Sequence, residues 1–284
     1  MKGFSVENEL TWYVEHPRTL RFAVLALMTV TLLVMAVDYF RGAYVSLPQD
    51  AVAFMFVWLI AAITTLAVLP QFSFVLGFLV SLLCMLVAWR ISALHDVTVV
   101  FYVLLVAFLI YLLMFARIVW RSINHEDPKL KLDRTDWHET LIRIYIGFDL
   151  VPHFTEKLFA GPGPRDADIK SFTELGVVDP AFFVTLGGFC ELGIAIGIGL
   201  GILTRLAAVC SALYFLIATI LGHHFFMGFI WVSPGGGWEY PLLMIVLLIS
   251  FQLDGAGPFS VDNVILRRVK PPRWLRAVMV PTRD

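Results

Sequence analysis

Four polar side chains recur at helical spacing within the apolar stretch Thr140–Lys157. At intervals of four, four and three residues they are Tyr145, Asp149, His153 and Glu156. Residues spaced in this way project from one face of an α-helix. Carboxyl and imidazole groups on one face can bind and transfer protons, and histidine titrates near neutral pH. The spacing therefore predicts an acid–histidine stripe that points into a helical bundle.

Further candidate groups lie in or beside three later apolar stretches. They are Glu191, His223, His224, Trp238, Glu239 and Tyr240. Glu191 lies about ten residues inside its stretch, which at about 1.5 Å per residue corresponds to a depth of about 15 Å. An ionisable group inside a bilayer costs roughly 2.5–3.5 kcal/mol, so it is a functional-site hypothesis by default.

We expect these groups to converge on one polar funnel that opens to the outer face of the membrane. The predicted catalytic residues are Asp149, His153, Glu191, His223 and His224, and the predicted substrate-binding residues are Tyr145, Trp238, Glu239 and Tyr240. Structural roles stay open at these positions. Asp149 or Glu191 can be protonated and hydrogen-bonded to a neighbouring helix, the histidines can be interface residues, and Glu239 can stabilise a helix N-terminus.

The elements that must position these residues are membrane-spanning helices. The chain has 284 residues, of which 59% are hydrophobic and 15% charged, whereas about a quarter of the residues in soluble domains are charged. A helix needs about 20 apolar residues to cross the hydrocarbon core, where lipid offers the backbone no hydrogen-bond partner. We therefore predict an all-α, polytopic membrane bundle of about eight transmembrane helices. The stretches that meet or approach the required length are Phe22–Tyr39, Ala51–Leu69, Phe72–Trp89, Val97–Val119, Thr140–Lys157, Ala181–Leu203, Leu206–Phe226 and Tyr240–Leu253.

The distribution of basic residues predicts the orientation of the chain. Of the 21 Lys and Arg residues, sixteen, including Arg143, fall in segments that are cytoplasmic if the N-terminus is inside, and five, including Arg90 and Lys157, fall outside. Cytoplasmic segments are enriched in Lys and Arg, so both termini are predicted to be cytoplasmic. We expect a multi-pass protein of a bacterial or archaeal cytoplasmic (inner) membrane.

A polar stretch between the fourth and fifth predicted spans divides the chain. The predicted parts are an N-terminal four-helix membrane region at 1–121, a cytoplasmic linker at 122–139, a four-helix bundle at 140–265 with an outer loop at 160–180, and a basic cytoplasmic tail at 266–284. Apolar residues at helical spacing in the outer loop predict a short helix on the outer surface, over whatever opens there.

Net charge and cysteine usage exclude several classes of function. A net charge of −1 leaves no basic field to bind nucleic acid by counterion release. Cys84, Cys190 and Cys210 each lie in an apolar stretch and form neither a C-x-x-C pair nor a haem-attachment or iron–sulfur pattern. They are predicted to be small hydrophobic residues, so the sequence supplies no redox centre of its own.

Three motifs in the second half resemble one known family. Glu191 with the glycine-rich run to Ala208, the stretch 236–243 and the stretch 254–262 are similar to the DoxX/DoxD family of small membrane proteins. The resemblance covers about residues 138–265 and implies a four-helix bundle. Some members of the family are the large subunit of a thiosulfate:quinone oxidoreductase, and others accompany respiratory or detoxification enzymes.

One position departs from the family pattern. The basic residue that is usual near Gly147 is absent or displaced, and Asp149 and His153 occur there instead. The site of this chain is therefore expected to differ in its charges from that of the family.

Two classes of function remain open. In the first, the protein is a quinone-linked oxidoreductase or a subunit of one. A quinone enters from the lipid, histidines meet its oxygens, Glu191 and Asp149 relay protons, and a small sulfur donor such as thiosulfate or a partner redox subunit supplies electrons. In the second, the protein is a non-catalytic membrane subunit or a transporter of protons or small solutes along the same groups.

A metal ion is an alternative to the quinone within the first class. His153, His223, His224 and one of Glu191 or Glu239 would give a nitrogen-rich set of ligands. Adjacent histidines of one helix point about 100° apart, so both reach one ion only if the helix unwinds locally.

Overall fold

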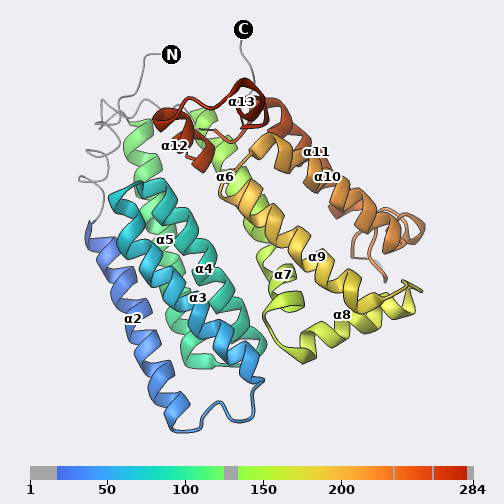
Figure 1. Ribbon diagram of the computed structural model, residues 1–284, viewed down its shortest axis with the longest axis horizontal. Helices are drawn as coiled ribbons and strands as arrows, with labels where there is room; N and C mark the ends of the chain where they lie inside the picture. The colour runs from blue at the N-terminus through green and yellow to red at the C-terminus, as the bar shows by residue number, and fades with distance from the viewer. Residues whose placement is uncertain (1–17, 125–133, 233, 258, 280–284) are drawn as a thin grey trace.

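Every regular element of the described residues is a helix, as the sequence predicts (Figure 1). The computed structural model describes residues 18–124, 134–232, 234–257 and 259–279. Most of the predicted linker at 122–139 falls in 125–133, outside the described residues, as do the first 17 residues and the last five. The all-α prediction is confirmed for the part that is described.

The first four long helices form one group. They are α2 (Arg18–Phe40), α3 (Gln49–Val68), α4 (Phe74–Leu94) and α5 (Thr98–Ile123), with the short 3₁₀ turn η1 (Leu69–Gln71) between α3 and α4. Pro70 is the middle residue of this turn and lies against Gly77, where an added Cβ would be 2.5 Å from the proline ring. The missing side chain lets α4 fold back closely on α3. Apolar residues cover all sides of α4, which is buried over most of its length.

The second group contains the remaining helices. They are α6 (Arg134–Asp149), α7 (Val151–Leu158), α8 (Pro162–Glu174), α9 (Pro180–Ile194), the π-helical turn η2 (Ala195–Gly199), α10 (Thr204–Leu221), the 3₁₀ turn η3 (His224–Met227), α11 (Glu239–Asp254), α12 (Val261–Arg268) and α13 (Arg273–Met279). The predicted span 140–157 is divided between α6 and α7. Pro152 at the start of α7 has no N–H to continue the hydrogen-bond ladder, which explains the break.

Six helical stretches of the described residues are long and apolar enough to cross a membrane. They are α2, α3 with η1, α4, α5, α9 with η2, and α10. The other two predicted spans correspond to the divided pair α6 and α7 and to the 16-residue helix α11. The protein is thus a multi-pass helical membrane bundle, while the count of eight and the cytoplasmic termini stay predictions.

α4 joins the two groups of helices. It packs against α7 and α12 as well as against α3 and α5. One apolar core runs through this junction and includes Phe78 of α4, Phe154 of α7 and Phe259 before α12. A second core lies between α6, η2, α10 and α11. Figure 1 shows α8 at one end of the molecule and α12 with α13 at the other; we refer to these as the α8 end, which the sequence predicts to be outer, and the α12 end.

Candidate functional site

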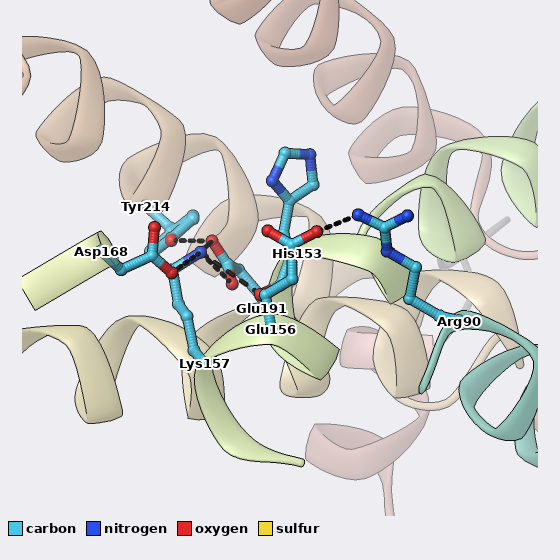
Figure 2. Close-up of polar contacts among 7 residues, drawn as sticks. All are labelled: Arg90, His153, Glu156, Lys157, Asp168, Glu191 and Tyr214. Carbon is cyan, nitrogen blue, oxygen red and sulfur yellow. Dashed lines mark hydrogen bonds and ion pairs between the residues drawn. The ribbon is translucent and has the colours of Figure 1, made fainter. Parts of the chain in front are cut away.

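Glu191 of α9 is the centre of a buried polar network. Its side chain is 7% exposed, and both carboxylate oxygens lie 3.1 Å from the Lys157 ammonium of α7. The Tyr214 hydroxyl of α10 donates a hydrogen bond of 2.7 Å to Glu191 Oε1. Figure 2 shows the Lys157 ammonium between Glu191 and Asp168 of α8, whose carboxylate is 4.0 Å away. The one ammonium group of Lys157 therefore lies beside two carboxylates.

Close packing of α7 and α9 brings this ion pair together. Gly188 lies one turn before Glu191, and a Cβ there would be 2.8 Å from the Leu158 side chain and 3.0 Å from Cβ of Lys157. The glycine thus removes the atoms that would keep the helices apart. Lys157 lies in the last turn of α7, where a long alkyl stem can carry its charged end away from the helix.

A cavity of about 100 Å³ lies against this network. It is lined by Leu150, His153, Glu191, Tyr214, Phe215, Ala218, Thr219, His224, Trp231, Tyr240 and Pro241. Successive ring centroids are 5.2–6.2 Å apart along the series Tyr214, Phe215, Tyr240, Trp231 and His224. The structure thus brings four of the predicted site residues to one cavity: His153, Glu191, His224 and Tyr240. We call it the aromatic cavity.

Asp149 adjoins the aromatic cavity through Tyr240. The Tyr240 hydroxyl donates a hydrogen bond of 2.5 Å to Asp149 Oδ2. Tyr145, one turn earlier, does not line the cavity and is 67% exposed. The expectation that the whole stripe points into the bundle is therefore wrong at Tyr145, because the face that α6 buries carries Trp137, Arg143 and Ile146 instead.

The two adjacent histidines have different surroundings. His223 is exposed, has a positive φ of 57° and lies edge-on to Phe226, outside the aromatic cavity. His224 lines the cavity, and its Nδ1 lies 3.0–3.1 Å from the carbonyl oxygens of Gly235 and Gly236. Since a carbonyl only accepts, Nδ1 carries the hydrogen, and Nε2 of a neutral ring is an acceptor.

Trp238 and Glu239 hold the loop between η3 and α11. The Trp231 backbone N–H donates a hydrogen bond of 3.1 Å to Glu239 Oε2. The Trp238 ring lies edge-on to Phe229 at a centroid distance of 4.6 Å. Neither residue lines the aromatic cavity. Glu239 is connected to the cavity by its hydrogen bond with Trp231, which is a lining residue.

Glu156, the last member of the predicted stripe, is turned toward the first group of helices. It forms an ion pair with Arg90 of α4, as Figure 2 shows. At the same end of α4, the His95 ring donates a hydrogen bond of 2.7 Å to the Ala160 carbonyl. The first group therefore contacts the site through two polar side chains, Arg90 and His95, which lie just beyond the end of the predicted span Phe72–Trp89.

No three His, Cys, Asp or Glu side chains of the described residues are arranged to hold a metal ion. His223 lies outside the cavity that His153 and His224 share with Glu191. The proposed ligands therefore do not form one coordination sphere.

Sequence reasoning missed two residues of the network. Lys157 was counted only as a charge outside the membrane, although a basic residue at the end of a predicted span can reach back along its own stem. Tyr214 is the one tyrosine in the apolar stretch 206–226, and a buried tyrosine hydroxyl usually finds a hydrogen-bond partner. Both signals were available in the sequence.

The burial of Arg143 was not predicted either. The sequence gives Arg143 only as a cytoplasmic charge, whereas in the structure its side chain is fully buried in α6. Its guanidinium donates hydrogen bonds of 2.6 Å to the carbonyl oxygens of Ile198, Gly199 and Phe259. A π-helical turn leaves carbonyls without the usual helical partners, and Arg143 satisfies two of those in η2.

Asp262 completes this second polar cluster at the α12 end. It accepts hydrogen bonds of 2.8–2.9 Å from the backbone N–H groups of Leu203 and Thr204 and from the Thr204 hydroxyl. Asp262 of α12 thereby caps the N-terminus of α10 across the fold. The motifs around 201–205 and 254–262 are thus explained by packing at the α12 end, away from the aromatic cavity.

The comparisons with known proteins identify one domain. Residues 139–224 match the family model described as DoxX. The predicted resemblance is confirmed over this segment, which includes Lys157, Glu191 and Tyr214, whereas Trp231 and Tyr240 lie beyond it. No curated protein and no solved structure matches the chain.

Proposed function

We propose that this chain, a multi-pass membrane protein with a DoxX domain at residues 139–224, is a quinone-linked component of a membrane oxidoreductase. The aromatic cavity would receive the quinone ring. The alternative assignments of the same groups are tested by the experiments below.

One observation supports this proposal most directly. The aromatic cavity combines a continuous wall of aromatic rings with a carboxylate that is almost fully buried. Aromatic walls favour a flat, apolar ring, and a few polar groups fix its orientation. Glu191 and His153 are the groups that can exchange protons with the oxygens of such a ring.

The proposed reaction needs protons as well as electrons. A quinone becomes a quinol by taking up two electrons and two protons. Two thiosulfate ions that join through a new S–S bond to form tetrathionate release two electrons and no proton. With a sulfur donor of this kind, or a partner redox subunit, the protons must reach the quinone through groups of this chain. Glu191 and His153 are positioned for that role.

Quinone binding can be tested with an intrinsic reporter. Trp231 lines the aromatic cavity, so a water-soluble short-chain quinone added to the full chain in lipid nanodiscs should quench tryptophan fluorescence in a saturable way. Trp231→Phe should remove most of the saturable quenching. Glu191→Gln and His224→Gln should weaken binding by about tenfold, since a lost hydrogen bond to a charged or oriented group costs about 1.4 kcal/mol or more.

The neighbouring histidine gives a matched control. His223→Gln should bind the quinone as the wild type does, because His223 lies outside the cavity. Equal quenching in the wild type and in Trp231→Phe, or equal weakening by both histidine substitutions, would contradict the proposal.

Transport of protons or a small solute is a second candidate, supported by a different observation. Lys157 lines a cavity at the α8 end, while Glu191 lines the aromatic cavity, so the ion pair lies between two spaces. In liposomes with an entrapped pH dye, proton movement without any quinone or donor would favour transport. Proton movement that requires quinone turnover would favour the oxidoreductase.

A further inference from the structure

A second cavity lies at the α8 end, where the two groups of helices meet. It has a volume of about 310 Å³ and is lined by Asp50, Lys157, Leu158, Gly161, Pro162, Arg165, Asp166 and Ile169. Asp50 comes from the N-terminus of α3, and the other lining residues come from α7, α8 and the segment between them. Charged side chains of both signs line it, which is typical of a hydrated space. We call it the vestibule.

The vestibule and the aromatic cavity share one ion pair. Lys157 lines the vestibule and Glu191 lines the aromatic cavity. Their charged groups are 3.1 Å apart, so a proton can pass between the cavities across a single contact. Beyond this contact, the Tyr214 hydroxyl is 2.7 Å from Glu191 and also lines the aromatic cavity.

We propose that Lys157, Glu191 and Tyr214 form a proton-transfer path from the vestibule to the aromatic cavity, and that Asp168 of α8 assists it by holding the lysine ammonium. This inference rests on the proposed function, because it identifies the source of the protons that a quinone in the aromatic cavity consumes. Figure 2 shows these four side chains, with dashed lines from Lys157 to both carboxylates and from Tyr214 to Glu191.

Charges around the path favour uptake of a proton. The titratable and charged side chains near Glu191 are His153, Glu156 and Lys157 of α7, Asp168 of α8, Cys190 of α9, Tyr214 of α10 and Tyr240 of α11. Arg90 of α4 pairs with Glu156. Lys157 is the ammonium that lies beside both Glu191 and Asp168, so these two carboxylates share its one positive charge, and one proton can be added to the three groups without building up net positive charge.

Two oxygen atoms of the path have no hydrogen-bond donor among the described residues. They are Glu191 Oε2 and Asp168 Oδ2, both buried. Glu191 Oε2 is close to the ammonium but accepts no hydrogen bond from it. Burial raises the pKa of the Asp168 carboxyl above its ordinary value, although Lys157 opposes this rise. Each atom is a place where a proton can be received.

The transfer involves no change of oxidation state. A proton moves from Lys157 Nζ to Glu191 along the 3.1 Å hydrogen bond to Oε1, the oxygen that Tyr214 also contacts. The ammonium and carboxylate thereby become a neutral amine and a carboxylic acid. The aqueous phase of the vestibule returns a proton to the amine. Glu191 then passes its proton to the acceptor in the aromatic cavity, directly or through the Tyr214 hydroxyl, and becomes a carboxylate again.

Infrared spectroscopy can follow this step without enzymatic turnover. In the full chain in nanodiscs, the carbonyl band of protonated Glu191 is identified by its loss in Glu191→Gln, and its appearance is timed after a rapid drop in pH. Lys157→Arg keeps the positive charge and the ion pair, but an arginine does not release its proton in proteins. We expect Lys157→Arg to slow protonation of Glu191 at least tenfold, and Lys157→Met to do the same if it folds.

An exposed lysine of α8 supplies a control, and the outcomes separate the two proposals. Lys170 and Glu174 form an exposed pair on α8, so Lys170→Arg should leave the rate unchanged. A wild-type rate in Lys157→Arg overturns the path, whether or not quinone binds. Slow protonation in Lys157→Arg together with a wild type that binds no quinone would retain the path and overturn the quinone proposal.

Discussion

Arg90 of α4 and Glu156 of α7 form an ion pair that links the N-terminal helices to the DoxX domain. The pair lies one residue along α7 from Lys157, which contacts Glu191. The first four long helices therefore do more than bury apolar surface: they fix the charge and position of α7 beside the aromatic cavity.

The link between Arg90 and Glu156 should be measurable as a coupling energy. Both side chains are about one-third exposed, 34% and 29%, so we expect a coupling of about 0.5–1 kcal/mol. A double-mutant cycle with Arg90→Met and Glu156→Gln, measured by unfolding in detergent, gives this value. The exposed pair Lys170 and Glu174 should give a smaller coupling in the same assay. A value of zero for Arg90 and Glu156 would show that the pair does not join the two groups.

The fold was largely predictable because long apolar stretches allow few alternatives in a membrane. The helical class follows from apolar length, and the four predicted residues that line the cavity, His153, Glu191, His224 and Tyr240, follow from polar groups inside or at the ends of the apolar stretches. The break between α6 and α7 was not predicted, since Pro152 lies inside the apolar stretch Thr140–Lys157. The exposure of Tyr145, which precedes the break in the same helix as Asp149, has a different cause: the buried face of α6 carries Trp137, Arg143 and Ile146.

The partners of the site residues were not predictable in the same way. Periodicity gives the face of a helix on which a residue lies, but not the neighbouring helix that approaches it. Lys157 meets Glu191 because Gly188 allows α7 and α9 to approach. The two residues are 34 positions apart in the sequence, and no local pattern encodes such a contact. For the same reason, the position of Arg143 in the sequence gives no sign of the carbonyl oxygens that η2 presents to it.

Arg143 should be sensitive even to substitution by lysine. Its planar guanidinium donates to three carbonyl oxygens from two segments, and a lysine ammonium does not reproduce this fork. We expect Arg143→Lys to lower the free energy of unfolding by about 2–4 kcal/mol, because buried acceptors lose their donors. Arg117→Lys, on an exposed position of α5, is the matched control and should change stability by less than about 0.5 kcal/mol. Equal effects would contradict a structural role for the buried guanidinium.

Asp262 predicts a pH dependence of stability. Burial raises the pKa of its carboxyl above the ordinary 3.8, although hydrogen bonds from Thr204 and Leu203 and the charge of Arg143 lower it. The folded state then binds the proton more tightly than the unfolded state, so this group stabilises the fold most at low pH and loses that contribution as pH rises through the raised pKa.

Comparison with a variant that does not titrate isolates this contribution. Relative to Asp262→Asn, the wild type should gain stability as pH falls from about 7.5 toward about 4.5, measured as the difference in thermal midpoint at each pH. A difference that shrinks over the same range would show that the hydrogen bonds outweigh burial, and that the carboxylate is the favoured form in the fold.

Two glycines of the DoxX domain should respond in opposite directions to alanine. A Cβ at Gly147 of α6 would lie 2.1 Å from the Gly199 backbone nitrogen and 2.2 Å from its Cα, so α6 and η2 would have to separate. We expect Gly147→Ala to destabilise the fold by about 3 kcal/mol or more, since the clash is with backbone rather than with a flexible side chain.

At Gly193 of α9, nothing lies within 4 Å of an added Cβ, and alanine is the better helix former by about 0.5–1 kcal/mol. Gly193→Ala should therefore leave stability unchanged or raise it slightly. Unfolding measurements on both variants test this difference. A similar loss of stability at the two positions would mean that Gly193 also contacts a helix in the membrane.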